Sequence, residues 1–175
     1  MRIYTRKGDN GTTLLWPKGR VGKDSQRVRA YGTVDEAQAF IGLLRTEVDS
    51  ESVDVGELLV RVARELWVLM TELATLPENR KAAGVTAEMV AALEHDIDDV
   101  QSRFDMPKDF AVPGDNRFSA IADVARATVR RAEREVVALA EEQSHVVEYL
   151  NRLSDLLWTL ARAKESGRLL AKDIS

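Results

Sequence analysis

The sequence contains no cysteine and only two histidines. Disulfide bonds, thiolate metal sites and cysteine nucleophiles are therefore excluded, and a zinc cluster is disfavoured. No stretch approaches the roughly 20 apolar residues that a membrane span needs, and the first residues lack the apolar region of a signal peptide. We therefore expect a soluble, cytoplasmic protein that neither crosses nor binds a membrane.

The chain has 175 residues, of which 45% are hydrophobic and 31% are charged. This size and composition are typical of one globular domain with a sizeable core, and they argue against a disordered chain and against a two-domain enzyme. We therefore expect a single domain over residues 1–175.

The net charge of −4 conceals an uneven distribution along the chain. Residues 1–32 carry a balance of +6, from eight Lys and Arg against two Asp, and the remainder carries −10. A basic segment on an acidic protein favours a small polyanion over DNA, because duplex binding usually needs a basic face across the whole domain. A solvated basic tail is the alternative.

Glycine is concentrated in the same basic segment. Five of the ten glycines fall within residues 1–32, interleaved with threonines and cations: Gly8, Gly11, Gly19, Gly22 and Gly32. Such a loop can turn tightly and surround phosphate oxygens with backbone N–H groups, hydroxyls and positive charge. The segment contains no Walker A motif. These residues alone leave phosphate binding and a plain glycine-rich loop equally open.

From Thr33 onward, apolar residues recur at helical spacing, which predicts five helices. Thr33-Val-Asp-Glu36 has the form of a capping box, so the first helix is expected near 33–48. Thr86 is expected to cap the third helix, which ends before Pro107. The second, fourth and fifth helices are expected near 55–76, 117–141 and 144–165. We therefore predict an all-α fold, an up-and-down five-helix bundle over 33–175 with residues 1–32 as an appendage.

Two polar groups lie on the last two predicted helices. Arg126, Arg130 and Arg134 are spaced four residues apart, so they share one face and repel one another unless anions lie between them. A solvated face neutralised by neighbouring glutamates is the alternative. The fifth helix carries a polar face opposite its leucines, consisting of Asn151, Ser154, Asp155, Trp158 and Arg162. Asn151 is either a reader of a base or ribose, or a surface residue.

Three separated segments together resemble one family. They are Tyr4-Thr-Arg-Lys-Gly-Asp-Asn-Gly-Thr-Thr13, then Arg27-Val-Arg-Ala-Tyr-Gly-Thr-Val-Asp-Glu36 with Gly42, then Ala125-Arg126 through Arg130-Arg-Ala-Glu-Arg134 to Tyr149-Leu-Asn-Arg-Leu-Ser-Asp155. With their spacing, they resemble the PduO-type ATP:cob(I)alamin adenosyltransferases along nearly the whole chain. The resemblance implies a homotrimer of five-helix bundles. It also implies that each ATP lies between the N-terminal nucleotide-binding loop of one chain and the arginine helix of its neighbour.

The resemblance also implies roles for individual residues. Asp35 and Arg126 match a pair that bridges subunits, and Phe110 matches an aromatic residue that displaces the lower axial base of the corrin. A core position for Phe110 is the alternative. Together with Arg130 these residues form the expected catalytic set. The expected ATP contacts are Thr5, Arg6, Lys7, Gly8, Thr13 and Lys23 in the loop, Arg130, Arg131, Glu133 and Arg134 on the fourth helix, and Asn151 on the fifth.

The chemistry implied by the resemblance is transfer of the 5′-deoxyadenosyl group of ATP to a reduced corrinoid, cob(I)alamin or cob(I)yrinic acid a,c-diamide. Triphosphate leaves and adenosylcobalamin forms. No protein general base is needed, because the cobalt nucleophile carries no proton, so catalysis reduces to positioning and charge neutralisation. ATP, Mg²⁺ and cobalamin are therefore the expected small molecules, with no dedicated metal ligands in the protein. A flavoprotein reductant and an adenosylcobalamin-dependent enzyme are the expected partners.

The sequence departs from the family pattern mainly on the corrin side. Pro113-Gly-Asp-Asn116 stands where a glycine pair is usual, and Asp123 stands where histidine is common. Gln38, Lys7 and the turn Trp16-Pro-Lys-Gly19 are further departures. Two other interpretations therefore remain open. One is a catalytically silent homologue that binds ATP or delivers a corrinoid. The other is a helical module that binds nucleic acid, which the acidic remainder of the chain disfavours.

Overall fold

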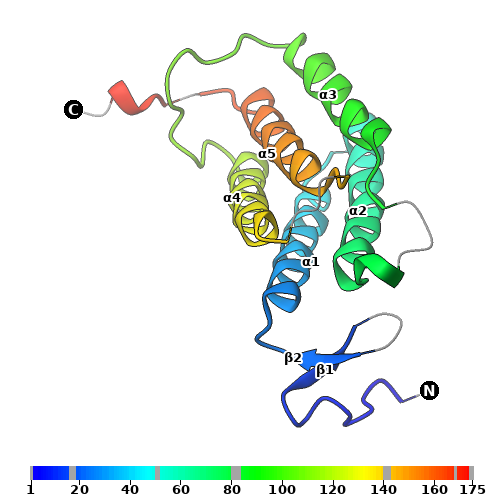
Figure 1. The fold of residues 1–175 in the computed structure, drawn as a ribbon. Helices are drawn as coiled ribbons and strands as arrows, with labels where there is room; N and C mark the ends of the chain where they lie inside the picture. The colour runs from blue at the N-terminus through cyan, green and yellow to red at the C-terminus, as the bar shows by residue number, and fades with distance from the viewer. Residues whose placement is uncertain are drawn as a thin grey trace.

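The structure is a computed structural model that describes residues 2–15, 19–49, 52–79, 84–139, 143–167 and 169–173. Five α-helices dominate the described residues, which confirms the predicted number and a predominantly helical fold (Figure 1). A two-stranded antiparallel hairpin precedes them, with β1 at Thr12–Leu14 and β2 at Arg20–Gly22. The helices are α1 (Gln26–Arg45), α2 (Val53–Ala74), α3 (Ala87–Gln101), α4 (Arg117–Val137) and α5 (Val146–Ala163), and short 3₁₀ turns follow α2 and α5.

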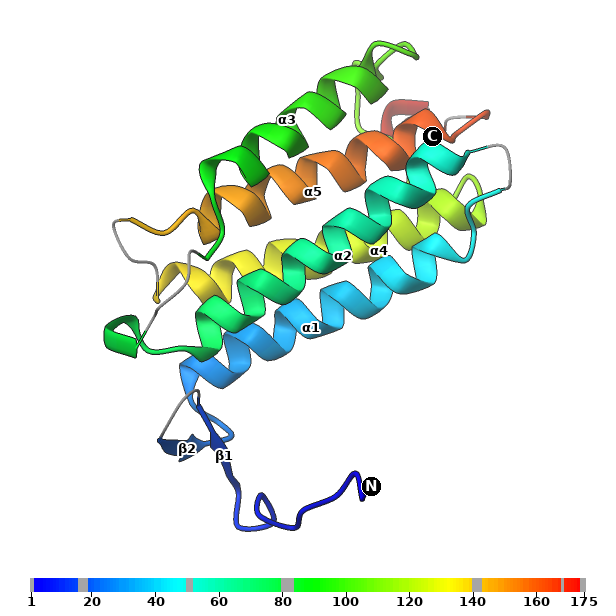
Figure 2. The same cartoon turned by 90° about the vertical axis from the view of Figure 1, so that its right-hand side faces the viewer.

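Successive helices alternate in direction, but they are not all neighbours in space (Figure 2). Helix α1 lies between α2 and α4, α4 packs on α5, and α5 packs on α3. The link over residues 102–116 joins α3 to α4 across one end of the bundle, and the hairpin lies at the opposite end (Figures 1 and 2). The antiparallel pairing of α1 with α4 is fixed at the hairpin end, where the Gln26 side chain donates to the Glu135 carbonyl at 2.8 Å.

The start of α1 corrects the predicted boundary between the N-terminal segment and the bundle. The helix begins at Gln26 and not at Thr33, so residues 26–32 belong to the bundle and not to an appendage. Ser25 occupies the N-cap position. The Thr33 hydroxyl donates to the Arg29 carbonyl at 2.9 Å, which is the back-bonding of a threonine inside a helix. The apparent capping box at Thr33 is therefore an internal helical segment.

The core is formed by the leucine-rich faces of the helices. Leu153 and Leu157 of α5 are completely buried, and each such side chain stabilises the fold by about 1.5–3 kcal/mol. The predicted polar face of α5 is only partly correct, because Ser154 and Arg162 are each 2% exposed and lie inside the bundle. Among the described helices, none combines the length and apolar character that would carry it across a membrane.

The starts of α3 and α4 lie where the sequence predicted them. Thr86 accepts from the backbone N–H of Met89, as expected for the cap of the third helix. Asn116 and Ser119 form a reciprocal capping box at the start of α4. A cap of this kind typically stabilises a helix by about 1 kcal/mol. Asn116 belongs to the segment in which the family pattern has a glycine pair, so this departure supplies a helix cap.

Candidate functional site

The segment before the hairpin is folded back onto it by Arg20. The Arg20 Nε atom donates to the Thr12 hydroxyl at 2.8 Å, and Nη2 donates to the Thr12 carbonyl at 3.1 Å and also to the Lys7 carbonyl. Arg20 therefore ties the loop that carries the predicted ATP contacts to both strands. Sequence reasoning counted Arg20 only as a positive charge, although its position within a glycine-rich hairpin was the available signal.

Gly8 and Lys23 lie against each other in this folded loop. The Lys23 backbone N–H donates to the Gly11 carbonyl at 2.9 Å, and a Cβ atom placed on Gly8 would lie 3.2 Å from the Lys23 Nζ atom. A side chain at position 8 would therefore crowd the ammonium group. The absence of a side chain at Gly8 thus leaves room for the exposed Lys23 ammonium, which is a group that can bind phosphate oxygens.

The remaining predicted loop contacts precede or follow Gly8 closely in the chain and are mostly exposed. Arg6 has a φ of 60°, in the left-handed region that non-glycine residues rarely adopt, and its guanidinium lies 5.5 Å from the centre of the Tyr4 ring. Thr5 and Lys7 are exposed, whereas Thr13 is partly buried within β1. The unusual backbone at Arg6 turns the chain so that a cation-rich loop faces solvent. The turn at Trp16 to Lys18 lies outside the described residues.

The arginine face of α4 consists of Arg126, Arg130 and Arg134. Arg130 and Arg134 are exposed, and the Arg134 Nη1 atom donates only to the Arg130 carbonyl, at 3.0 Å. The Arg130 guanidinium has no hydrogen-bond or ion-pair partner among the described residues. Within the described residues, neither guanidinium forms an ion pair, so two strong cations project from α4, which suits an anion-binding face.

Arg131 and Asn151 are engaged in different ways. Arg131 pairs with Glu36 of α1 at 2.6 Å, so its guanidinium is directed toward α1, about 100° around the helix from Arg130. Asn151 donates from Nδ2 to Glu133 at 3.2 Å and accepts from Arg152 at 2.7 Å. The partly buried Glu133 and Asn151 therefore form a polar edge between α4 and α5, beside the exposed Arg130.

Asp35 and Arg126 do not contact each other among the described residues of one chain. Asp35 is exposed on α1, and Arg126 donates from Nε to Asp123 at 3.0 Å. Asp123 is 6% exposed and also accepts from the buried Arg162. Sequence reasoning missed Arg162 as a buried residue and noted Asp123 only as a departure from the family pattern.

Phe110 lies in the link between α3 and α4 and is 89% exposed. The alternative that it is a core residue is therefore wrong. A short antiparallel bridge with the C-terminal segment holds its backbone, because Val112 N–H donates to the Leu169 carbonyl at 2.8 Å and Ala171 N–H donates to the Phe110 carbonyl at 2.8 Å. The ring is thus presented at the end of the bundle opposite the hairpin.

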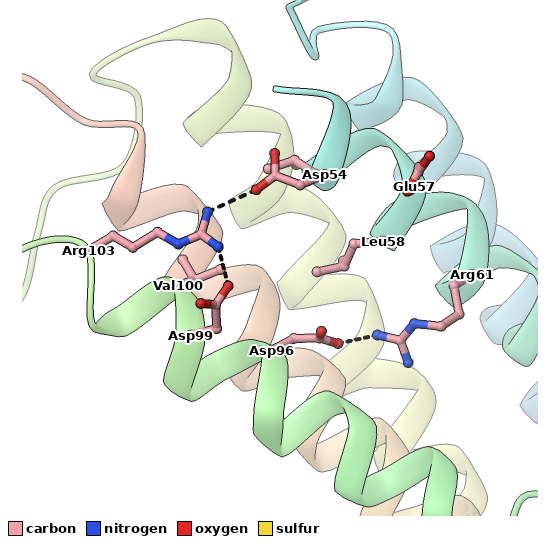
Figure 3. Close-up of a pocket in the computed structure, with 9 residues that line it drawn as sticks. Asp54, Glu57, Leu58, Arg61, Asp96, Asp99, Val100 and Arg103 are labelled. Carbon is pink, nitrogen blue, oxygen red and sulfur yellow. Dashed lines mark hydrogen bonds and ion pairs between the residues drawn. The ribbon is translucent and has the colours of Figure 1, made fainter. Parts of the chain in front are cut away.

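A groove of about 350 Å³ between α2 and α3 contains none of the predicted site residues (Figure 3). Arg103 bridges Asp54, at 2.8 Å, and Asp99, while Arg61 pairs with Asp96. The hydrogen bond from Arg103 lowers the pKa of Asp54. Two of the ion pairs that line this groove, Arg103 with Asp54 and Arg61 with Asp96, join α2 to the α3 side and brace the two helices. The described residues contain no cluster of three or more His, Cys, Asp or Glu that could hold a metal ion.

Comparisons with known proteins agree with this geometry over nearly the whole chain. The family model for cobalamin adenosyltransferase matches residues 3–164. A corrinoid adenosyltransferase of Bacillus subtilis (strain 168) is 41% identical over 167 residues, which cover 93% of this chain and 86% of that protein.

Solved structures support the same assignment. A phenylalanine-to-histidine variant of a PduO-type ATP:corrinoid adenosyltransferase from Lactobacillus reuteri, complexed with cobalamin and ATP, has a TM-score of 0.91 and 29% identity. It covers 98% of this chain and 97% of its own. An arginine-to-lysine variant complexed with ATP has a TM-score of 0.87 and 29% identity, and covers 96% of this chain and 99% of its own. The chain therefore belongs to the cobalamin adenosyltransferase family.

Proposed function

We propose that this protein transfers the 5′-deoxyadenosyl group of ATP to the cobalt of a reduced corrinoid, either cob(I)alamin or cob(I)yrinic acid a,c-diamide. With cob(I)alamin the products are adenosylcobalamin and triphosphate. The observation that carries the proposal is the exposed Arg130, which has no partner among the described residues, on the arginine face of α4 in a member of this family. A cation of this kind suits the charge of a triphosphate leaving group.

The reaction is an in-line displacement. The Co(I) electron pair forms a bond to the 5′ carbon of ATP, the bond from that carbon to the triphosphate oxygen breaks, and triphosphate leaves with the bonding electrons. Cobalt is formally oxidised to Co(III). The protein aligns the two substrates and stabilises negative charge on the leaving group, and these two effects lower the barrier without any proton transfer by the protein.

The proposed ATP contacts come from three places in the fold. Thr5, Arg6, Lys7, Gly8, Thr13 and Lys23 belong to the folded loop; Arg130, Arg131, Glu133 and Arg134 belong to α4; and Asn151 belongs to α5. The exposed Lys23 ammonium, packed against Gly8, supports a phosphate role for the loop. Residues 1–175 then act together as one adenosyltransferase domain.

Mg²⁺ would be bound mainly by the phosphates of ATP. This ion keeps several waters and usually takes only one or two carboxylates from a protein. Mg²⁺ would neutralise part of the charge that develops on the triphosphate.

Phe110 is proposed to lie against the lower face of the corrin. An exposed aromatic ring on a backbone fixed by the C-terminal bridge can occupy the place of an axial base. Exclusion of that base favours four-coordinate Co(II), which is easier to reduce to the nucleophile. We expect a flavoprotein to supply the electron and an adenosylcobalamin-dependent enzyme to take the product, in the cytoplasm.

The proposed assembly is a homotrimer with shared sites. The hairpin and the link that carries Phe110 lie at opposite ends of the bundle (Figure 1). Helix α4 has 21 residues and is therefore about 30 Å long, so a loop and a Phe110 from the same chain could not meet at one corrin. This separation supports a site built from two chains, with Asp35 of one chain pairing with Arg126 of the next.

Light scattering tests the proposed trimer. We expect a mass three times the 19.5 kDa of the chain, and a monomer at micromolar concentration would contradict the assembly. Mixing a Lys23→Ala variant with an Arg130→Ala variant tests the shared site. Random mixing should restore about one quarter of the sites, because loop and arginine face come from different chains.

The activity is tested by following the absorbance of chemically reduced cobalamin after addition of ATP and Mg²⁺. We expect an ATP-dependent change to the spectrum of adenosylcobalamin. ATP binding without this change would identify a silent homologue. Salt-sensitive binding of labelled DNA without ATP binding would instead favour a nucleic-acid module.

A further inference from the structure

Three charged side chains are buried together between α4 and the end of α5. The side chains of Asp123, Arg162 and Glu165 are 6%, 2% and 1% exposed. Arg162 Nη2 lies 2.5 Å from Asp123 Oδ2 and 2.8 Å from Glu165 Oε1. The Arg162 guanidinium also lies 5.7 Å from the centre of the Trp158 ring. Burial of these charges costs desolvation free energy, and a buried ion pair is weak evidence for stabilisation. A functional role is therefore a better explanation for the cluster than stability alone.

Asp123 uses its two oxygens for two different arginines. Oδ2 accepts from the buried Arg162, while Oδ1 accepts from Nε of Arg126 at 3.0 Å. Arg126 is 30% exposed and belongs to the arginine face. The hydrogen bond to Asp123 occupies Nε of Arg126 and restricts the orientation of its planar guanidinium.

Arg162 has two acidic partners in this cluster, because it pairs with Glu165 as well as with Asp123. Asp123 in turn lies between two arginines, the buried Arg162 and the partly exposed Arg126. Its carboxylate therefore attracts the Arg126 guanidinium in addition to accepting its hydrogen bond.

Residues next to Glu165 in the chain contact the link that carries Phe110. Asp115 accepts from the backbone N–H groups of Ser166 and Gly167 at 3.1 and 3.2 Å, and Asn116 donates to the Lys164 carbonyl at 2.8 Å. The bridge to Phe110 follows directly in the chain. The buried cluster thus connects Arg126 to the support of Phe110.

We propose that Asp123, backed by Arg162, is a positioning residue that fixes the Arg126 guanidinium for the corrinoid side of the reaction. The proposal rests on the proposed function and deepens it. Arg126 is the residue proposed to pair with Asp35 of the next chain at the shared site, and a small displacement of a group that shapes a site lowers turnover strongly. Asp123 acts through Arg126 and touches neither substrate.

A double-mutant cycle tests this relationship. Asp123→Asn should lower kcat for cobalamin by about tenfold and leave the KM for ATP within about twofold, because only the alignment of Arg126 is lost. In an Arg126→Ala background, Asp123→Asn should change kcat by less than about twofold, since the group through which it acts is absent. If the double variant lowers kcat by the product of the two single reductions, Asp123 and Arg126 act independently and the proposal is overturned.

Two further variants separate positioning from stability. Tyr149→Phe on α5 removes the buried hydrogen bond from the Tyr149 hydroxyl to Glu65, 2.7 Å long, and should lower the melting temperature without changing kcat. Asp123→Glu keeps the charge and should recover part of the turnover; failure to exceed Asp123→Asn would count against the proposal. If Asp123→Asn does not fold, the cycle is run with Arg162→Lys, with the same expected non-additivity.

These measurements distinguish failure of the proposed adenosyltransferase activity from failure of the positioning role of Asp123. A wild-type protein without ATP-dependent adenosylation would refute the proposed function. A wild-type protein that is active, with Asp123 and Arg126 effects that multiply, would refute only the positioning role.

Discussion

The two ends of this bundle treat charge in opposite ways. At the hairpin end, the cations Arg6, Lys7 and Lys23 are exposed, and the loop that carries them is held by hydrogen bonds to its own backbone. At the end that carries Phe110, Arg162 is buried between two carboxylates. One end gains stability when an anion arrives, whereas the other is already neutralised and keeps its shape without a ligand.

This contrast predicts a division of mutational effects. Changes at the hairpin and at the exposed Arg130 and Arg134 should act mainly on ATP affinity, because they remove attraction to an anion. Changes around Phe110 should act mainly on turnover of the corrinoid, because they alter the shape of a surface that is already formed.

Arg130→Ala should have the largest effect on ATP. A charge-assisted hydrogen bond to triphosphate contributes about 1.5–3 kcal/mol, so kcat/KM for ATP should fall by about 10- to 150-fold. Arg117→Ala is the matched control, because Arg117 is an exposed arginine on the same helix, paired with Glu47. Steady-state kinetics measure both variants. Full activity of Arg130→Ala at low ATP would show that the phosphate role of α4 is wrong.

Phe110→Ala should act on the end of the bundle that is proposed to bind the corrin. Loss of an 89% exposed ring should leave the melting temperature and ATP affinity nearly unchanged. Turnover of Co(II)-cobalamin should fall by about tenfold or more, the equivalent of about 1.4 kcal/mol in the barrier. A corrinoid without a lower base should be affected less.

Trp67→Ala removes another exposed aromatic ring, on α2, and is the control for Phe110→Ala. Equal losses on both corrinoids would reject the axial role of Phe110. A strong fall in melting temperature would also count against it.

Arg20→Ala should have a smaller effect, confined to ATP. The variant loses the contacts that fold the loop onto the hairpin, and an exposed hydrogen bond is worth about 1 kcal/mol, so the KM for ATP should rise by about fivefold. Arg29→Ala removes an exposed arginine from α1 and controls for the loss of charge. A similar KM for both variants would mean that Arg20 contributes charge and not loop shape.

Asn116→Ala should have the smallest effect on activity. Loss of the α4 cap costs about 1 kcal/mol, or roughly 2–4 °C in melting temperature, with no change in the KM for ATP. Asn116→Ser keeps a capping hydroxyl but loses the hydrogen bond to Lys164. Calorimetry of the two variants therefore separates the cap from the tie to the C-terminal segment, and an unchanged melting temperature for Asn116→Ala would contradict both roles.

Local signals in the sequence predicted the Thr86 cap and the start of α4, whereas contacts between residues far apart in the chain were not predicted. Thr86 and the start of α4 near Arg117 were predictable because a cap bonds within three residues of itself. The start of α1 was missed because Thr33 bonds back to Arg29 inside the helix, which a four-residue motif does not reveal.

The corrin side shows the same limit more strongly. Arg162 is buried because Asp123, on another helix, accepts from it, and no periodicity within α5 encodes that partner. Phe110 is 89% exposed, and its carbonyl accepts from the Ala171 N–H, a partner about 60 residues away that no local pattern predicts. The cationic loop could be predicted from composition, whereas the folding of that loop by Arg20 could not.

Transfer of the 5′-deoxyadenosyl group is tested most directly by identifying the phosphate product of a reaction with reduced cobalamin, ATP and Mg²⁺. Phosphorus NMR should detect one triphosphate for each light-sensitive cobalt–carbon bond formed, as displacement at the 5′ carbon requires. Release of orthophosphate or diphosphate without formation of that bond, or no reaction of ATP at all, would contradict the account.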